Sequence, residues 1–387
     1  MHSRLDWYVS SDIAVSRRVE VSPAAAGSAH AVKTGIVLLN LGGPTTLDAV
    51  EPFLLELFAD REIIQLPFQG WLGPFIARRR APGVRRQYAS IGGGSPILRY
   101  TEAQGRGLVE RLDRLSPATA PHGFYVAFRY ASPKSEDALR AMQAAGVERA
   151  VAFTQYPQFS CATTGSSLNE LWRAVDRLGL RDAFTWSILD RWPVHDGFID
   201  AVAETVREGL QDFPPEERER VVLLFSAHSL PMRFISRGDP YPQEIGASVH
   251  RVMDRIGFSH PYLLAYQSKV GPVKWLEPST PWVIERLAAR GHKHVLVVPI
   301  AFTSDHIETL SELDRDYGNL ARRLGITHYR RVPALNDRPR FLDALADLVH
   351  RHLASGEVHS SQYRLRCSGC ENEACRIIVN PVRTISR

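Results

Sequence analysis

Two stretches of the sequence, VLLNLGGP at residues 37–44 and VLLFSAHSLP at residues 222–231, follow the same scheme. Each is an apolar run followed by a polar turn that ends in proline, and the second begins 185 residues after the first, about half of the 387-residue chain. This echo predicts two similar α/β lobes with a ligand cleft between them. Because ligands of open α/β sheets bind beyond the carboxyl ends of the strands, the residues that follow such runs are the first candidates for chemistry.

Apolar runs and amphipathic segments alternate from about residue 34 onward, which favours a doubly wound, parallel α/β fold. Continuous apolar runs are typical of strands covered on both faces, and they span residues 35–41, 124–131, 149–157, 221–229, 262–268 and 294–302. Helices are expected near residues 101–115, 135–145, 164–179, 196–212, 242–257, 279–290, 308–325 and 338–354. The expected division is an N-terminal extension (1–32), a first lobe (33–190), a second lobe (191–355) and a cysteine-bearing tail (356–387).

The composition is that of an ordinary globular protein, with 44% hydrophobic and 23% charged residues. A net charge of +5 favours anionic partners only mildly in so long a chain, and a solvated basic surface is the simpler interpretation. No run of 18 apolar residues occurs, so no membrane-spanning helix is expected. Residues 1–32 contain three arginines but also three acidic residues, which count against a clean targeting presequence.

Two candidate catalytic groups follow apolar runs of the second half. His228, in FSAHSLP, suits proton transfer because the pKa of an unperturbed histidine lies nearest neutrality, although a turn-bonding histidine has the same pattern. Asp305, Glu308 and Glu312, in FTSDHIETLSELD, are spaced to share one α-helical face, where carboxylates can collect protons or hard cations. The alternative is a purely structural role, in which Asp305 and Glu308 form a capping box at the start of a helix and Glu312 is solvated.

Three further segments are candidates for binding a ligand or a membrane surface. GGGSP at 92–96 matches no nucleotide-binding motif and is best interpreted as a turn. Arginines beside aromatic residues, in 77–88 and at Arg129–Tyr130, suit carboxylates, or form a solvated basic face. The segment 52–76 is unusually apolar, which indicates either a core helix plus loop or a lip for a greasy ligand or a membrane surface.

The segment RCSGCENEACR at 366–376 holds Cys367, Cys370 and Cys375, and the only other cysteine is Cys161. A C-x2-C-x4-C spacing with one distant cysteine fits zinc or an iron–sulfur cluster, and the spacing alone does not choose between them. Four protein ligands leave no open position, so such a site is expected to be structural or sensory. A zinc-tail nucleic-acid-binding protein is a competing class, but no aromatic-and-basic recognition module accompanies the cysteines.

Together these motifs resemble the ferrochelatase family. LLNLGGP, QYASIGGGSPI, FRYASP, FTQYPQFSCATTGSSLNE, FSAHSLP, RGDPYPQE, YQSKVGP, PIAFTSDHIETLSELD and the cysteine tail occur in this order, and the resemblance covers about residues 33 to 377. It implies a chelatase-like fold of two lobes with parallel four-stranded sheets, and an enzyme that inserts ferrous iron into protoporphyrin IX as the last step of haem synthesis. A tetrapyrrole carrier without activity is a second hypothesis, which the presence of both His228 and Glu308 disfavours. A chelatase for cobalt or for another tetrapyrrole is a third.

The resemblance also assigns roles to residues. It implies that His228 accepts a pyrrole proton and that Glu308, backed by Asp305 and Glu312 on a π-bulged helix, forms a path for protons or iron. The implied porphyrin, iron-side and supporting contacts are Arg80, Tyr88, Ser95, Arg129, Tyr130, Trp275 and His306. Leu41 stands where the family motif carries methionine, so a handover of metal through a thioether is not expected there.

Cofactor, partners and location follow from the same resemblance. It implies a [2Fe–2S] cluster on Cys161, Cys367, Cys370 and Cys375, with ferrous iron as substrate. It further implies a homodimer, peripheral contact of the apolar lip with the matrix face of the inner mitochondrial membrane, and no nucleic-acid partner. A bacterial cytoplasmic member is the alternative location.

Overall fold

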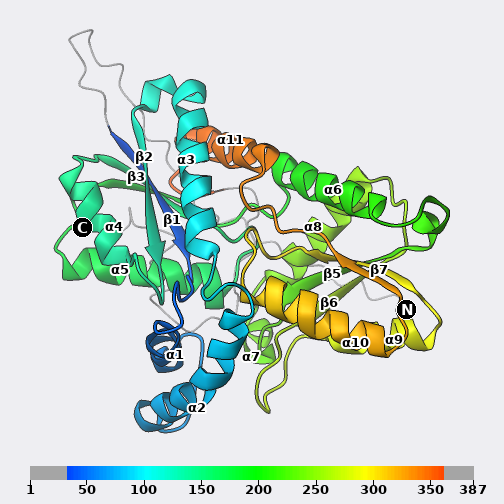
Figure 1. The fold of residues 1–387 in the computed structure, drawn as a ribbon. Helices are drawn as coiled ribbons and strands as arrows, with labels where there is room; N and C mark the ends of the chain where they lie inside the picture. The colour runs from blue at the N-terminus through cyan, green and yellow to red at the C-terminus, as the bar shows by residue number, and fades with distance from the viewer. Residues whose placement is uncertain (1–32, 361–387) are drawn as a thin grey trace, which may run out of the picture.

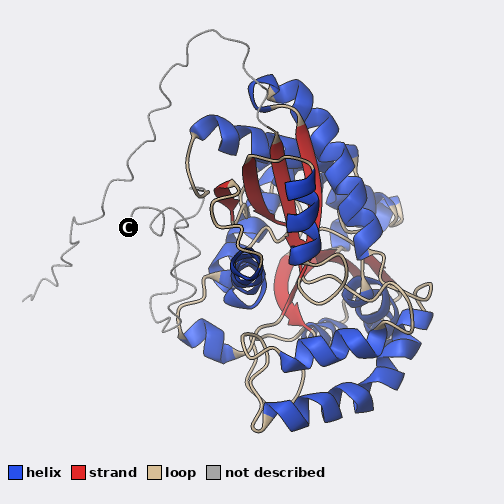
Figure 2. Ribbon diagram, turned by 90° about the vertical axis from the view of Figure 1, so that its left-hand side faces the viewer, coloured by secondary structure: helices blue, strands red, loops and turns tan. Residues whose placement is uncertain are grey.

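The computed structural model describes residues 33–360, which form two parallel four-stranded sheets with helices packed on their faces (Figures 1 and 2). The strand orders are β2-β1-β3-β4 and β6-β5-β7-β8, so both sheets repeat one topology. The strands are β1 (Thr34–Asn40), β2 (His122–Phe128), β3 (Arg149–Thr154), β4 (Thr185–Leu189), β5 (Val222–His228), β6 (Tyr262–Gln267), β7 (His294–Pro299) and β8 (His328–Arg331). The two stretches quoted first contain β1 and β5, the equivalent strands of the two sheets, and the predicted repeat of α/β units is confirmed.

Two strands were missed by the sequence patterns, and both are edge strands. β4 has the short sequence TWSIL, and β8 has the sequence HYRR, with no residue fully buried. Every residue of β1, in contrast, is buried between neighbouring strands and helices. Continuous apolar runs identified the four inner strands and also the edge strands β2 and β6, whereas the edge strands β4 and β8 are short and have no such run.

The α-helices largely follow the expected segments, except near the amino end. They are α1 (Val50–Ala59), α2 (Gln69–Ala89), α3 (Ile97–Leu115), α4 (Ser135–Ala144), α5 (Ser166–Arg177), α6 (Asp196–Gln211), α7 (Met232–Ser236), α8 (Tyr241–Arg255), α9 (Thr280–Ala289), α10 (Gly318–Arg323) and α11 (Pro339–Ser355). Short 3₁₀ turns are η1 (Pro117–Thr119) and η3 (Pro215–Arg220), and π-helical segments are η2 (Cys161–Gly165) and η4 (Glu308–Tyr317). α2 was not expected as a long helix, because it contains Pro74 and Pro82.

The two lobes share one hydrophobic core. Its largest cluster joins Leu38 and Phe153 of the first sheet to Phe225 of the second. Helix α11 packs against both α3 and α6 and contributes further residues to this cluster (Figure 1). Gly107 of α3 permits a close approach there, because a Cβ at this position would lie 2.6 Å from a methyl of Leu342. The shared core fixes how the carboxyl ends of the two sheets face one another.

Candidate functional site

His228 is the last residue of β5, at the carboxyl edge of the second sheet, and is partly exposed. Its Nδ1 lies 2.6 Å from the carbonyl oxygen of Ser229. Because a carbonyl oxygen only accepts, Nδ1 carries the proton and the Nε2 of the neutral ring holds a lone pair. Trp275, a predicted support, forms a backbone bridge with Pro231, so it lies against the turn that follows His228. The arrangement leaves Nε2 as the basic atom of this histidine.

Glu308 begins the π-helix η4, which confirms the distorted helix that the family resemblance implied. Its Oε2 is buried and lies 3.0 Å from Nε2 of His306, without the alignment of a hydrogen bond. The Nδ1 of His306 donates to the carbonyl oxygen of Ser304 at 2.8 Å. Because Nδ1 carries the hydrogen, the lone pair of a neutral His306 is on Nε2, the atom that faces the carboxylate oxygen of Glu308. Glu308 and His306 thus form a close pair of one carboxylate and one imidazole.

Gln267, the last residue of β6, connects His228 to the π-helix. The two residues are register partners on neighbouring strands. The side-chain Nε2 of Gln267 donates to the backbone carbonyl of Glu308 at 3.0 Å and to the carboxylate of Glu312 at 3.1 Å. Its Oε1 accepts from the hydroxyl of Ser226 at 2.8 Å. This buried amide sets the position of η4 relative to His228, a role that the sequence analysis missed because Gln267 ends an apolar run.

The expectation that Asp305, Glu308 and Glu312 share one α-helical face is wrong. The segment is a π-helix that starts at Glu308, so Asp305 precedes it and the 3.6-residue period does not apply. The alternative capping box is also wrong, since η4 has no side-chain cap. Asp305 is buried and accepts from Arg331 Nη1 and Asn336 Nδ2, each at 2.8 Å. Burial alone would raise the pKa of Asp305, but the charge of Arg331 and the bond from Asn336 hold it below its usual value.

Glu312 is not merely solvated either. Its Oε1 accepts from the backbone N–H of Ser268 at 2.9 Å and from the hydroxyl of Tyr317 at 2.5 Å. Its Oε2 accepts from the hydroxyl of Ser268 at 2.5 Å and from Gln267. Four donors fill the two oxygens, so this carboxylate ties η4 to the end of β6.

The first lobe places two tyrosines near Glu308, of which Tyr88 is buried and Tyr156 is partly buried. Tyr88 lies in the last turn of α2, and Tyr156 lies just beyond β3. Burial raises the pKa of both hydroxyls, and the negative charge of Glu308 raises both further. The Tyr156 hydroxyl bonds Asn40 Oδ1 at 2.9 Å, at the end of β1. Glu308 therefore lies where the two lobes meet, beside tyrosines that keep their protons at neutral pH.

Ser95 and Arg80 occupy the approach to this region. Ser95 is buried, and its N–H donates to the carbonyl oxygen of Pro44 at 2.7 Å. This ties the GGGSP turn to the loop after β1, where a Cβ at Gly94 would lie 2.1 Å from a carbonyl oxygen. Arg80 is exposed on α2, with its guanidinium carbon 5.7 Å from the ring centroid of Phe58. Both residues thus belong to the rim built by α2 and the β1 loop.

Arg129 and Tyr130 follow β2, and both bind Asp60. Arg129 Nη2 and the Tyr130 hydroxyl donate to the same Oδ2 at 2.7 and 2.5 Å. Arg129 also lies 3.4 Å from Glu170 and donates to Ser166 at 3.1 Å. These groups line a charged hollow of about 760 Å³. The predicted iron-side pair is therefore engaged in a network with carboxylates rather than presented as two unbonded ligands.

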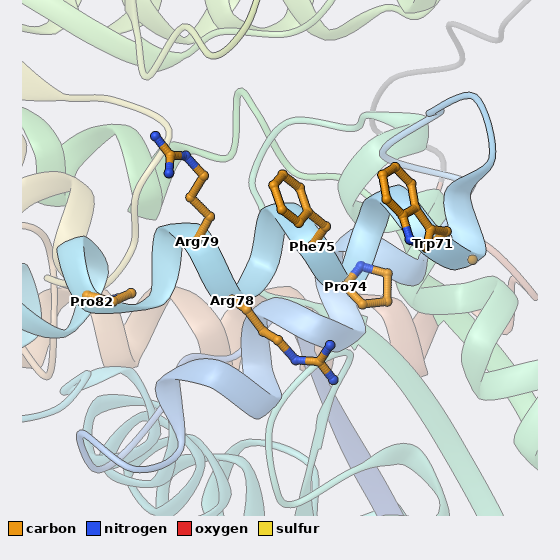
Figure 3. A pocket seen from close by; sticks show the side chains of 7 residues that line it. Trp71, Pro74, Phe75, Arg78, Arg79 and Pro82 are labelled. Carbon is orange, nitrogen blue, oxygen red and sulfur yellow. The ribbon is translucent and has the colours of Figure 1, made fainter.

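The apolar lip lies on and before α2. Phe68, Trp71 and Phe75 are 87%, 72% and 54% exposed. The rings of Trp71 and Phe75 stack with centroids 5.9 Å apart, on the same side of α2 as Arg79, and they border an open groove of about 740 Å³ (Figure 3). The buried side of α1 and α2 packs against Ile307, the residue before Glu308. The unit of α1 and α2 thus joins the exposed aromatic face to the residue that precedes Glu308.

Cys161 is the one predicted cluster ligand within the described residues, since Cys367, Cys370 and Cys375 lie outside them, as does the extension 1–32. Cys161 begins η2 and is partly buried, and its N–H donates to buried Asp239 at 2.8 Å. The described chain ends nearby: the hydroxyl of Ser360 bonds Asp190 at 2.5 Å. The neighbouring Arg191 stacks 4.2 Å from the ring centroid of Phe159, two residues before Cys161.

The fold has two parallel-sheet lobes, with His228 at the end of β5 and the pair of Glu308 and His306 at the start of η4. The family comparison assigns this arrangement to the metal chelatases. A family model described as Ferrochelatase matches residues 33–353. Proteins named "Ferrochelatase, mitochondrial" from Xenopus laevis, Bos taurus and Homo sapiens are 53%, 54% and 53% identical. The matches cover 95%, 89% and 89% of this chain and 90%, 83% and 82% of the relatives.

The chain belongs to the ferrochelatase family and is a lyase, as its motifs predicted. Among solved structures, SirB from Bacillus subtilis with Fe3+ is 12% identical with a TM-score of 0.49, over 84% of this chain and 99% of that one.

Proposed function

We propose that this ferrochelatase inserts ferrous iron into protoporphyrin IX in the cleft that holds His228 and Glu308. In the reaction two pyrrole N–H bonds break, the four ring nitrogens bind Fe2+, and two protons leave. His228 Nε2 accepts the first proton. The observation that carries this assignment is the bond from Nδ1 to the Ser229 carbonyl, because it leaves Nε2 with the lone pair.

The pair of Glu308 and His306 handles the second proton. Its carboxylate oxygen and imidazole nitrogen are 3.0 Å apart, so a small movement passes a proton from one group to the other. Glu308 has 29% of its side chain exposed, which gives the pair a route to solvent. The backbone bond from Gln267 keeps this pair in a fixed position relative to His228.

Asp305 and Glu312 act as positioning carboxylates in this proposal. Asp305 fixes the segment before η4 through Arg331, and Glu312 fixes the helix itself through Ser268 and Tyr317. Their filled hydrogen-bond capacity favours this role over a direct path for iron.

The remaining predicted contacts divide by location. Arg80, Tyr88 and Ser95 line the rim on the first lobe, and Arg80 suits a propionate of the porphyrin because a guanidinium binds carboxylates in two-point fashion. Trp275 supports the turn of His228 from the second lobe. Arg129 and Tyr130 act with Asp60 on the side where iron arrives.

The activity is tested by following the fluorescence of protoporphyrin IX after anaerobic addition of Fe2+. The wild type should lose the signal rapidly, and His228→Ala should bind porphyrin but leave it fluorescent. His250→Ala, which removes an exposed histidine from α8, serves as the matched control and should behave as wild type. Wild-type turnover by His228→Ala would refute its role as the proton acceptor.

We also propose that Cys161, Cys367, Cys370 and Cys375 hold a [2Fe–2S] cluster. Six residues lie between Ser360 and Cys367, and these seven Cα–Cα steps reach at most about 25 Å when extended, which suits a return to Cys161 from the nearby anchor on Asp190. The partly buried thiol of Cys161 at a helix start is accessible to such a group. The cluster would supply a covalent link between the chain end and the first lobe.

The lip supports peripheral contact with a membrane. Exposed tryptophan and phenylalanine beside Arg78 and Arg79 have the chemistry of an interfacial surface, where aromatic rings sit among headgroups. None of the helices within residues 33–360 has the length and hydropathy needed to cross a bilayer. The names of the relatives support a mitochondrial location, with the inner membrane, its matrix face and a homodimer as the finer proposals.

A further inference from the structure

A histidine–carboxylate cluster lies at the opposite edge of the second sheet from His228. His294 and His328 are the first residues of β7 and β8, so they lie at the amino ends of these strands. Glu217 belongs to the 3₁₀ turn η3. The ligand atoms of the three side chains all lie within 4.8 Å of one another. The mechanism proposed above uses none of these residues.

The cluster converges on one oxygen atom. Nε2 of His294 lies 2.7 Å, and Nε2 of His328 3.6 Å, from Oε2 of Glu217. The two histidines are register partners in the parallel pair of β7 and β8, and their rings stack with centroids 4.9 Å apart and planes 18° apart. Since neighbouring strands are spaced about 4.8 Å apart, the backbone itself holds the two rings together.

We infer that Glu217, His294 and His328 form a binding site for a divalent transition-metal ion of the Zn2+ class. Two imidazoles and one carboxylate are a ligand set that binds zinc, with water in the fourth position. Bond lengths of about 2.0–2.1 Å in a tetrahedron place ligand atoms about 3.3 Å apart. The two histidine nitrogens lie 2.7 and 3.6 Å from the Glu217 oxygen, and all three atoms lie within 4.8 Å of one another, so side-chain rotations that bring them to the tetrahedral spacing would complete the site.

The environment of the cluster suits an ion that enters from solvent. The side chains of Glu217 and His328 are 28% and 33% exposed, whereas that of His294 is 9% exposed. Phe213 packs near both rings and restricts their orientation. The neighbouring cation Arg218 donates to the backbone carbonyl oxygens of Phe213 and Gln211 at 3.1 and 3.2 Å, so its guanidinium is bound to backbone rather than to Glu217.

A metal here would join three separate elements of the second lobe. Glu217 lies on η3, and the histidines lie on an inner and an edge strand. The ion would therefore fasten the edge strand β8, which carries Arg331 at its other end. The expected consequence is a more stable second lobe, without a direct part in the chemistry of the cleft.

The test titrates the purified full-length protein, with its cluster intact, with Co2+ as a spectroscopic probe and then with Zn2+ as a competitor. The wild type should show d–d absorption of Co2+ with nitrogen and oxygen ligands, displaced by Zn2+. Glu217→Gln and His328→Gln should each weaken this site at least about 100-fold, because loss even of an outer-shell partner costs about 10–100-fold. Cobalt bound to cysteine is distinguished by its thiolate charge-transfer band in the near ultraviolet.

The control is His122→Gln. His122 begins β2 and lies 2.7 Å from Asp113, so it offers the same histidine–carboxylate contact without a third ligand. It should keep the full Co2+ signal. Zn2+ should raise the melting temperature of the wild type and of this control, but not of Glu217→Gln or His328→Gln. Without added metal, the melting temperatures of these two variants should equal that of the wild type. Equal Co2+ binding by His328→Gln and His122→Gln would overturn the site.

Discussion

Arg331→Met should destabilise the protein strongly, because it leaves the buried carboxylate of Asp305 without its cationic partner. The side chains of Arg331 and Asp305 are 7% and 8% exposed and are 2.8 Å apart. Breaking one partner of a buried ion pair costs about 3–5 kcal/mol, since the remaining charge is left without compensation. For roughly 330 ordered residues at about 2.1 cal/mol/K each, this lowers the melting temperature by about 4–7 °C.

Arg331 has a second, exposed partner that supplies the control. Its Nε and Nη2 bind the carboxylate of Asp314 at 2.6 and 2.8 Å, and that side chain is 40% exposed. Asp314→Asn should therefore cost less than about 1 kcal/mol, as exposed pairs do. The assay is thermal unfolding followed by circular dichroism, with Asp305→Asn combined with Arg331→Met expected to recover part of the loss.

The pH dependence of this effect has a defined sign. In the wild type the pKa of Asp305 is lower in the folded than in the unfolded state, so the ionised carboxylate adds to the free energy of unfolding. This stabilisation is complete above the unfolded pKa of about 3.9 and is lost as the pH falls through the lower folded pKa. In Arg331→Met burial dominates and the carboxyl pKa rises, so the penalty is greatest at neutral pH and shrinks toward pH 5. Two results would refute the buried-charge reasoning. One is a difference in melting temperature between wild type and Arg331→Met that stays constant between pH 7.5 and 5. The other is an equal fall in melting temperature in Asp314→Asn.

Three other changes test the proposed site. Glu308→Gln should lower turnover about 100-fold or more while porphyrin affinity, measured by fluorescence quenching, changes little, since general acid–base groups contribute about 10²–10⁴-fold; the reverse pattern would indicate a binding role. Cys161→Ser should remove the visible absorption of the purified protein, and an unchanged spectrum would exclude Cys161 as a ligand. Trp71→Ser with Phe75→Ser should reduce co-sedimentation with anionic vesicles, whereas Trp282→Ser, an exposed tryptophan of α9, should not; equal binding by both would remove the lip from membrane contact.

The sequence predicted six of the eight strands and the class of fold, because strands that are buried by covering helices contain continuous apolar runs. It located His228 and Glu308 because each follows such a run. It did not predict the partner of Asp305, because Arg331 lies on β8, whose HYRR sequence has no apolar run. The same omission hid the cluster of His294 and His328, which exists only through the pairing of β7 with β8.

The sequence predicted which residues form the site better than it predicted their hydrogen-bond partners. The periodicity of Asp305, Glu308 and Glu312 was evaluated for an α-helix, and the π-helix gives each carboxylate a different partner. The tautomer of His228 is set by the carbonyl oxygen of Ser229, and that of His306 by the carbonyl oxygen of Ser304. Such contacts are set by the local path of the chain, which residue types and spacing do not specify.

The position of α11 has a consequence for how the protein is made. This helix comes last among the described helices, yet Phe341 and Leu345 belong to the core that also contains Leu108 and Leu112 of α3. During synthesis the first lobe therefore emerges with that face of α3 uncovered, and it stays so until most of the chain has left the ribosome. An exposed apolar helix face of this kind invites aggregation or binding by chaperones. A premature stop before residue 339 would consequently leave neither lobe properly closed, although every strand of both sheets had already been translated.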